Sequence, residues 1–370
     1  MVIYRPALRF KEGEYTALSS LRADIRAQII PYFVVPPLRE RDPEKGRSLN
    51  ADEIAYVVGD RIGRHWPILP AYIDVQHVLN DLDDVGLQKL HRQAAQRNSQ
   101  LIPVVPIGEV GSPVWKSLIR ETYPRAAIHI SHEDLDDELL IEGLKSLGVA
   151  AKDCELFVDF TGAELRPDLA TESVAGIIAG LSELAPWGCI IFQASSFPSK
   201  NPADAGGECS IPRHEWSIFS GMALTSGIPT ARIGFSDFGA DSGAISFPKK
   251  PSGGRPIPHV RYTTATDTVV IRGASEGEYS PVMRQVLKRL VRHPEFAGET
   301  YSVADRELVR AANGYSSVGN ATTWRRWNMA HHFVRVVRDL GSLFGVEFPH
   351  DARLEIHSQR RLFESMNNGD

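Results

Sequence analysis

Short apolar segments alternate with longer amphipathic segments along the chain as far as residue 239. Most of the apolar segments end in polar or turn-forming residues, and the amphipathic segments carry apolar residues at helical spacing. Their centres are continuous apolar runs, which are typical of parallel strands covered on both faces. We therefore expect eight strands, at 3–10, 32–37, 71–77, 101–107, 126–131, 155–160, 189–193 and 231–239.

The segments between these strands predict helices, as a sheet built from βα units requires. The expected helices cover 14–29, 51–62, 85–96, 113–122, 136–147, 171–184 and 216–226. The same units could build a doubly wound open sheet, but no glycine-rich phosphate-binding fingerprint follows the first strand. Because the strands number eight, we expect an α/β fold of the (β/α)8, TIM-like barrel type.

The pattern changes after residue 239. Segments 259–264 and 268–272 flank a short turn, which predicts a β-hairpin. A helix over 281–292 follows, and we expect it to be the eighth helix of the barrel. The hairpin would then belong to an insertion, residues 240–278, in the loop after the eighth strand. In a barrel this loop lies on the face that carries enzyme sites.

A last helix is expected over 322–343. Its apolar stripe comprises Phe333, Val337, Leu340 and Phe344. A second stripe at helical spacing comprises Trp324, Asn328, His331 and Arg335. We expect two parts of the chain, a barrel at 1–293 and a C-terminal helical extension at 294–370 that packs on it.

Composition narrows the class of protein. The formal net charge of -5 argues against a nucleic-acid partner. The start of the chain lacks the pattern of a secretory signal, and no apolar run reaches the ~20 residues needed to span a bilayer. The three cysteines form neither a disulfide framework nor a zinc-binding pattern. We therefore expect a cytoplasmic protein without a membrane segment.

Polar side chains at the C-terminal ends of barrel strands converge on one mouth. Asp74, Asp159 and Asp237 lie on the third, sixth and eighth expected strands, and we expect their side chains at this mouth. Converging carboxylates must hold a cation, share a proton or face basic side chains. Their oxygen ligands would suit a divalent cation, Mg or Mn, better than zinc. The alternative is that they cap helices or pair with Arg9 and Lys11 as structural groups.

The expected roles fall into two groups. Candidate catalytic residues are Lys11, Asp74, His129, Asp159 and Asp237. Candidate substrate-binding residues are Arg9, Glu40, Gln193, Arg325 and His331. Lys11 could form a Schiff base or contact a phosphate, and the alternative is an ion pair with a carboxylate. His331 and Arg325 could form an anion-binding surface, and the alternative is a hydrogen-bonded histidine in a docked helix.

Known catalytic signatures are incomplete in this chain. Asp237-Phe238-Gly239 resembles the kinase DFG segment, but no glycine-rich loop or HRD segment accompanies it. A serine hydrolase of the GxSxG type is equally unsupported. The basic residues of 249–255 and 288–292 are expected to be solvated surface.

Two segments carry a resemblance to a known family. Residues 4–15 contain a Lys/Gly/Glu signature, and residues 319–332 contain Trp-Arg followed by His331-His332. Both resemble the beta protein family of phages and bacteria. The resemblance implies a phage or bacterial origin and a link to phage–host conflict, and it implies no particular activity.

Two functions remain open from the sequence. The first is a hydrolase, assisted by a metal ion, whose site in the barrel mouth acts on an anionic or phosphorylated substrate. The second is a non-catalytic scaffold that presents the hairpin at 259–272 or the C-terminal helix to a protein partner. The lack of a complete catalytic motif and the length of chain beyond the barrel support the second. The frequency of enzymes among (β/α)8 barrels favours the first slightly, by analogy of fold.

Overall fold

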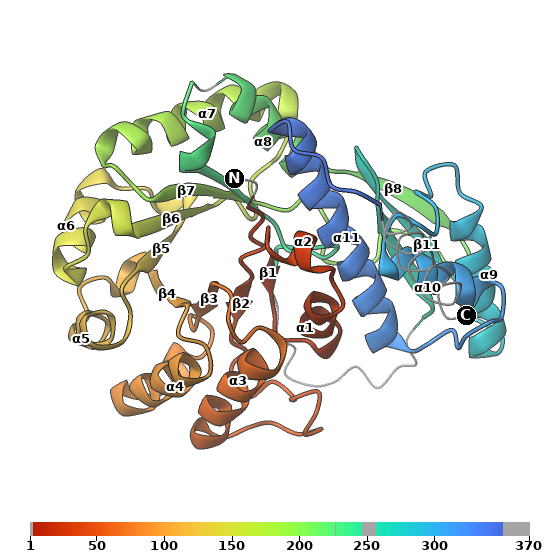
Figure 1. Ribbon diagram of the computed structural model, residues 1–370, viewed down its shortest axis with the longest axis horizontal. Helices are drawn as coiled ribbons and strands as arrows, with labels where there is room; N and C mark the ends of the chain where they lie inside the picture. The colour runs from red at the N-terminus through yellow and green to blue at the C-terminus, as the bar shows by residue number, and fades with distance from the viewer. Residues whose placement is uncertain (1–2, 226, 246–256, 351–370) are drawn as a thin grey trace, which may run out of the picture.

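The computed structural model describes residues 3–225, 227–245 and 257–350. Within them, eight parallel strands follow the order β1-β2-β3-β4-β5-β6-β7-β9 (Figure 1). The barrel strands are β1 Ala7–Leu8, β2 Tyr32–Val34, β3 Ala71–Asp74, β4 Leu101–Pro106, β5 Ala126–Ser131, β6 Cys154–Asp159, β7 Cys189–Gln193 and β9 Ile233–Ser236. The segment before β1 closes the barrel, because Tyr4 bridges to Phe235 and the Ala7 amide donates to the Asp237 carbonyl at 2.7 Å. The expected (β/α)8 barrel is confirmed.

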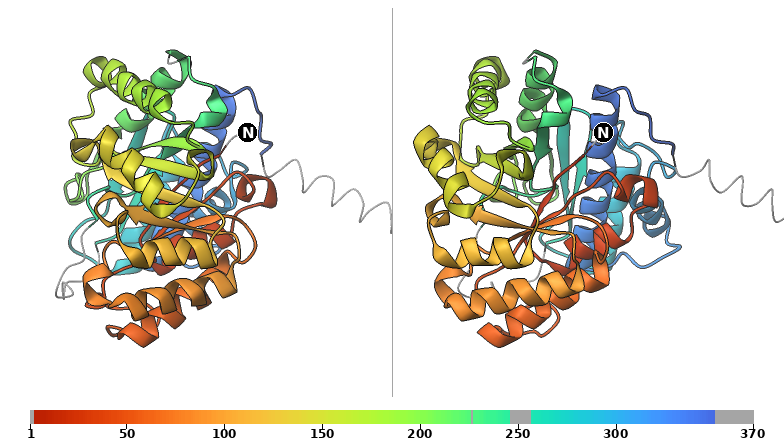
Figure 2. Two further views of the ribbon diagram at one scale, coloured as in Figure 1. Left: turned by 90° about the vertical axis from the view of Figure 1, so that its left-hand side faces the viewer. Right: turned by 60° about the vertical axis from the view of Figure 1, so that its left-hand side comes forward.

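Helices follow the strands on the outside of the barrel (Figure 2). They are α1 Glu12–Ser19, α2 Ala23–Arg26, α3 Ala51–His65, α4 Asp84–Arg97, α5 Pro113–Thr122, α6 Asp137–Leu147, α7 Pro167–Leu184 and α8 His214–Thr225. Five 3-10 turns lie between them, at Leu79–Asp81, Ile107–Glu109, His132–Asp134, Ala151–Asp153 and Thr230–Arg232. Local signals set several boundaries: Asn50 and Glu53 form a capping box at the start of α3, and Gly148 ends α6 with a φ of 71°.

The core has two layers. One apolar layer fills the barrel and includes Tyr32, Tyr72, Val104, Phe157 and Ile191. A larger layer lies between the strands and the surrounding helices. The interior also holds a polar group of three residues, because Arg5 donates to the Tyr72 hydroxyl at 2.9 Å and pairs with Glu155 at 3.2 Å.

A small antiparallel sheet lies beside the barrel, on the right of Figure 1. Its strands are β8 Glu208–Pro212, β10 His259–Thr263 and β11 Asp267–Arg272, in the order β10-β11-β8. The expected hairpin is confirmed as β10 and β11, which pair from His259↔Arg272 to Thr263↔Thr268. The edge strand β8 was not predicted, because it is short and lies in the loop between β7 and α8.

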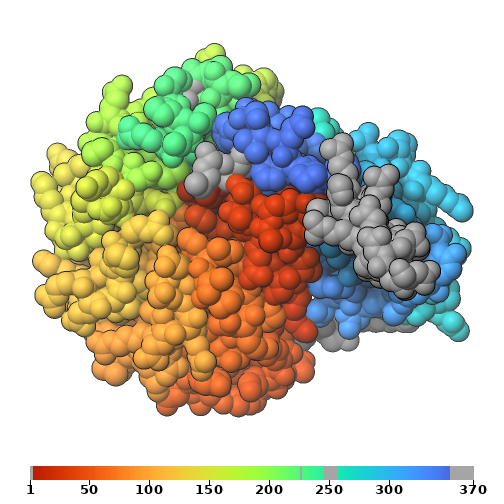
Figure 3. Space-filling model, in the orientation of Figure 1, coloured from red at the N-terminus to blue at the C-terminus, as the bar shows by residue number. Residues whose placement is uncertain are grey.

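The helix expected over 281–292 is not the eighth helix of the barrel. It forms α9, Tyr279–Val291, which packs against β10, β11 and the short helix α10, Val303–Ala312. The barrel is instead covered here by α11, Ala321–Leu343, which packs along α1 and lies between α8 and α2 (Figures 1 and 3). This arrangement follows from burial, because α11 is apolar on more than one side while α9 buries a single stripe.

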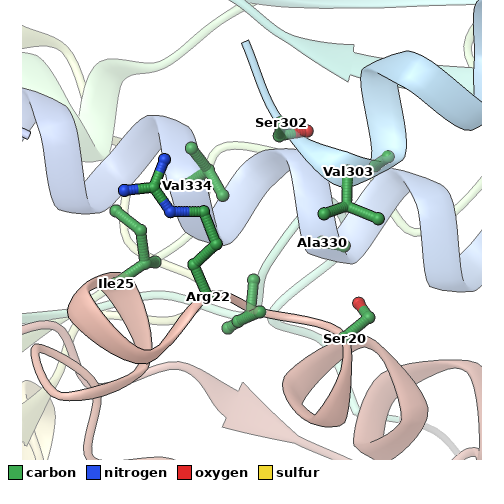
Figure 4. Close-up of a pocket in the computed structure, with 9 residues that line it drawn as sticks. Ser20, Arg22, Ile25, Ser302, Val303, Ala330 and Val334 are labelled. Atoms are coloured by element: carbon green, nitrogen blue, oxygen red, sulfur yellow. The ribbon is translucent and has the colours of Figure 1, made fainter. Parts of the chain in front are cut away.

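The contact between the N-terminal helices and α11 is close. A Cβ added to Gly13 in α1 would lie 2.7 Å from the Thr322 carbonyl oxygen of α11. The gap that remains between α1–α2, α10 and α11 has a volume of only about 10 Å³ and is bordered by Arg22, Ser302 and Ala330 (Figure 4). A gap of this size holds a water molecule at most.

The division of the chain at residue 293 stays a prediction, and residues 351–370 lie outside the described part. Among the described helices, none combines the length and the apolar character that crossing a membrane would need.

Candidate functional site

His129 and Asp159 form the central pair of the barrel mouth. They lie near the ends of the neighbouring strands β5 and β6, and His129 Nε2 is 3.3 Å from Asp159 Oδ2. Burial lowers the pKa of His129, but the Asp159 and Asp74 carboxylates outweigh it, so the pKa is raised. Burial raises the pKa of Asp159, but hydrogen bonds from His129 and Thr161 outweigh it, so the pKa is lowered. The pair therefore favours a protonated imidazole beside an ionised carboxylate.

Asp74 lies close to this pair. Its carboxylate accepts hydrogen bonds from the Tyr32 hydroxyl at 3.0 Å and from the Gln76 amide at 2.8 Å. Burial, followed by the charge of Asp74, raises the pKa of Tyr32, so its hydroxyl stays protonated. The rings of Tyr32 and His129 are 6.5 Å apart.

His77 is a second histidine at this mouth, and its pKa is shifted in the opposite direction. Burial lowers the pKa of His77, the Asp74 carboxylate raises it, and a charge on His129 lowers it further. The net result is a lowered pKa. Two histidines with oppositely shifted pKa values therefore line the same site.

Both histidines open onto a hollow of about 880 Å³ above the ends of β3, β4 and β5. Its wall also carries carboxylates and one arginine; these residues are Arg39, Asp81, Glu109, Asp134 and Asp136. The carboxylates give the rim a negative potential, while Arg39 and a protonated His129 are its cations. A ligand with several negative charges would be repelled by this rim.

Asp237 does not belong to this site. Its side chain is 2% exposed and accepts hydrogen bonds from the Tyr4 hydroxyl and the Gly239 amide. His332 Nε2 lies 3.0 Å from its second oxygen. Burial raises the pKa of Asp237, but His332 and Tyr4 outweigh it and lower it. Asp237 thus joins the barrel to α11, and its buried carboxylate is not accessible to a substrate.

The metal site expected from three aspartates is not formed. Asp74, Asp159 and Asp237 each have separate partners, described above, and Asp237 is directed toward α11. Within the described ranges, no group of three or more His, Cys, Asp or Glu side chains is placed to hold a metal ion. The residues present therefore do not fit the expected Mg or Mn ion.

His331 and Gln193 are also enclosed. His331 Nδ1 lies 2.9 Å from Asp305 Oδ2, its Nε2 lies 2.8 Å from the Thr263 carbonyl oxygen, and Tyr262 stacks on its ring at 3.8 Å. Gln193 is 2% exposed and accepts a hydrogen bond from Ser236. The expected anion-binding surface at His331 is replaced by the alternative, a hydrogen-bonded histidine in a docked helix.

The remaining candidates gather at the end of β1. Lys11 forms an ion pair with Glu40. Arg9 and Arg325 both contact Asp241, and Arg325 also contacts Glu14 at 3.0 Å. The structure thus brings Arg9 and Arg325 together, on a different side of the mouth from His129.

Sequence reasoning missed three residues of these sites. Tyr32 begins the apolar run of the second expected strand, 32–37, and no pattern marks it as a site residue. Asp241 and Arg261 lie in or beside a Gly/Ser/Pro-rich segment with no catalytic pattern. The tertiary fold alone brings Tyr32 to Asp74 and brings Asp241 to Arg9 and Arg261.

The fold and the mouth together define a (β/α)8 barrel protein with a histidine–carboxylate site at the C-terminal ends of its strands. The chain belongs to the Beta protein family, whose sequence model matches residues 4–338. The resemblance noted at the two ends of the sequence is therefore confirmed.

Comparison with solved structures gives distant matches. Triosephosphate isomerase from Bartonella henselae is 11% identical, with a TM-score of 0.34 over 65% of this chain and 92% of that chain. The carboxyl transferase domain of Rhizobium etli pyruvate carboxylase is 11% identical, with a TM-score of 0.37 over 93% of this chain and 48% of that chain. Similarity at this level says nothing about activity. A search among curated proteins found no match.

Proposed function

We propose that the protein is a hydrolase whose acid and base are the two histidines of the barrel mouth. The observation that supports this most directly is the His129–Asp159 pair, 3.3 Å apart, beside a second histidine in the same hollow. Environments that push the pKa values of two titratable groups apart are a mark of acid–base sites.

The roles follow from the directions of the shifts. His77, with its lowered pKa, is the neutral base that takes a proton from the attacking water. His129, with its raised pKa, is the acid that gives a proton to the leaving group. Asp159 holds the protonated form of His129, and Tyr32 holds Asp74 in place.

The rim restricts the substrate. An anionic or phosphorylated group at the bond to be cleaved would face Arg39 and the protonated His129. The carboxylates of the rim favour a substrate whose remaining part is neutral or positively charged. A phage origin, a role in phage–host conflict and a cytoplasmic location stay predictions.

The geometry gives less support to the alternative function, a non-catalytic scaffold that binds a protein partner. In β10 and β11 most residues are buried, and α11 buries both of its histidines along with its apolar residues. A hairpin and a helix buried in this way offer little surface to a protein partner.

Chromogenic substrates test the proposal: p-nitrophenyl phosphate, bis-p-nitrophenyl phosphate and p-nitrophenyl acetate. On whichever is cleaved, His77→Asn and His129→Asn should each lower kcat/KM by about 10²–10⁴-fold, the usual size of an acid–base contribution. His293→Asn is the matched control, because His293 pairs with Glu208 on the small sheet, away from the mouth.

The pH profile provides a second readout. Activity requires neutral His77, so it rises with pH through a value below 6.5, and it requires protonated His129, so it falls through a value above 6.5. The proposal is wrong if the double variant His77→Asn/His129→Asn matches the wild type on every substrate.

A further inference from the structure

A second polar pocket lies at the same end of the barrel, between the end of β1, strand β10 and the first turns of α1 and α11. Its volume is about 260 Å³. The polar residues of its wall are Lys11, Glu12, Asp241, His259, Arg261, Thr322, Arg325 and Asn328. The pocket shares no lining residue with the hollow at His129.

Three guanidinium groups meet at Asp241. Arg9 pairs with the carboxylate, Arg261 Nη1 lies 2.6 Å from Oδ1, and Arg325 Nη1 lies 2.7 Å from Oδ2. Burial raises the pKa of Asp241, but the three arginines outweigh it and hold the pKa well below its usual range. The arginines therefore already bind one anion, a carboxylate of the chain itself.

The charges of this cluster do not cancel. Glu14, which contacts Arg9 and Arg325, is its second carboxylate. Three arginines facing two carboxylates leave an excess of one positive charge in the cluster. In the rest of the pocket wall Lys11 and Glu12 carry opposite charges. The first turn of the long helix α11, at Ala321 and Thr322, adds the partial positive charge of a helix N-terminus to the pocket wall.

The side chain that solvent reaches most readily is Arg325. It is 33% exposed, while Arg9 and Arg261 are each 15% exposed and lie deeper. The described hydrogen bonds of Arg325 to carboxylates both use Nη1. A ligand entering the pocket would meet Arg325 first and Asp241 behind it.

The cluster is held in place by the backbone and by packing. Phe10, between Arg9 and Lys11, has a φ of 56°, a left-handed conformation that is strained for a non-glycine residue. Arg9, before this residue, joins the cluster at Asp241, while Lys11, after it, lines the pocket and pairs with Glu40. The guanidinium of Arg261 lies 4.5 Å above the Phe197 ring, which restrains it from the other side.

We propose that this pocket binds the phosphate group of a small molecule, held by Arg325 and Arg261, with Asp241 as the internal anion that competes with it. Arginine and a helix N-terminus are the groups that proteins use to bind phosphate. A volume of about 260 Å³ suits a small phosphorylated compound rather than a nucleic acid. The proposal does not depend on hydrolysis at His129.

Calorimetric titration at constant ionic strength tests it, with inorganic phosphate, glucose 6-phosphate and glucose as the probes. We expect saturable binding of one equivalent of phosphate or glucose 6-phosphate and none of glucose. Arg325→Gln should weaken that binding at least tenfold. Asp241→Asn should tighten it at least tenfold, because the competing carboxylate is gone. Arg92→Gln, a control that removes an exposed arginine of α4, should leave it unchanged.

The outcomes separate this pocket from the hydrolase site. His129→Asn should lower kcat/KM for hydrolysis by about 10²–10⁴-fold and leave phosphate binding intact. If Asp241→Asn does not fold, a melting temperature of Arg325→Gln that no longer rises with phosphate supports the proposal. Phosphate binding that is absent from the wild type, or that Arg325→Gln leaves unchanged, overturns it.

Discussion

Replacing His332 by alanine tests whether Asp237 is a structural group rather than a catalytic one. His332 Nε2 lies 3.0 Å from Asp237 Oδ2, and its Nδ1 lies 2.8 Å from the Thr263 hydroxyl. The imidazole thus connects α11 with β10 and with the end of β9. Alanine removes these contacts and leaves the Asp237 carboxylate buried with Tyr4 and the Gly239 amide as partners.

The expected cost is large because both partners are enclosed. Asp237 is 2% exposed and His332 is 3% exposed, so water cannot replace the lost imidazole without opening the structure. Removing one partner of a buried charged pair typically costs 3–5 kcal/mol. Domains are stable by about 5–15 kcal/mol in total, so His332→Ala should remove about a fifth or more of the stability.

Urea unfolding followed by circular dichroism measures this cost. His332→Gln, whose amide can still donate to Asp237, should lose only about 1 kcal/mol. Ser342→Ala, at an exposed position of the same helix, should stay within about 0.5 kcal/mol of the wild type.

The direction in which the pKa of Asp237 is shifted sets how the free energy of unfolding changes with pH. The pKa of Asp237 is lowered in the native protein, so its stabilisation is complete above the unfolded carboxyl value and is lost as pH falls through the native value. Loss of His332 removes the largest influence that lowers the pKa of Asp237, so this pKa is higher in the variant than in the wild type and the variant carboxyl takes up a proton at higher pH. The difference between wild type and His332→Ala should therefore narrow from pH 7.5 to pH 4.5. A loss below 0.5 kcal/mol, or a difference independent of pH, refutes the reasoning.

Three further predictions concern stability and reactivity. Burial lowers the pKa of His91 to about 3, so the native state stays neutral while the unfolded state takes up a proton below about pH 6.5. Protonation of His91 in the unfolded state should by itself lower the free energy of unfolding by about 2 kcal/mol between pH 6.5 and 5.0. Urea unfolding of His91→Gln should not show this decrease. Gly13→Ala, whose Cβ would press on the α11 backbone, should lose about 1–3 kcal/mol, measured by thermal unfolding. Burial raises the pKa of the Cys189 thiol to about 11, so a thiol reagent should label Cys209 in the native protein and reach Cys189 and Cys154 only after unfolding; rapid native labelling of all three thiols would contradict this.

The barrel could be predicted because each βα unit carries its own pattern. Continuous apolar runs such as 189–193 bury both faces, and the helical spacing between runs leaves few other arrangements for eight units. The closure of the barrel through Tyr4 and Phe235 could not be predicted from the sequence, since a single bridge leaves no periodic pattern. Strand β8 was missed for a related reason: its exposed edge position gives it little apolar content.

The candidate site was predicted in part. Asp74, His129 and Asp159 end strands, and strand ends of a barrel meet at one mouth. Asp237 also ends a strand, but α11 covers that side and supplies His332 as its partner. His331 and His332 point to different sides of α11, and each meets its own buried aspartate, Asp305 or Asp237. No sequence spacing marks pairs that lie 26 and 95 residues apart.

The amino-acid sequence by itself determined the strands, most helices and the end of the barrel at which the polar residues gather, because those features depend on local periodicity and on the direction of parallel strands. Only the tertiary structure decided that α11 rather than α9 covers the barrel beside α1, because the order of the helices along the chain does not show which of them packs on the barrel. It also decided which polar residues share a pocket. Asp159 meets His129, Asp237 meets His332, and Asp241 meets Arg9, because burial requires each charge to find a partner wherever the fold provides one.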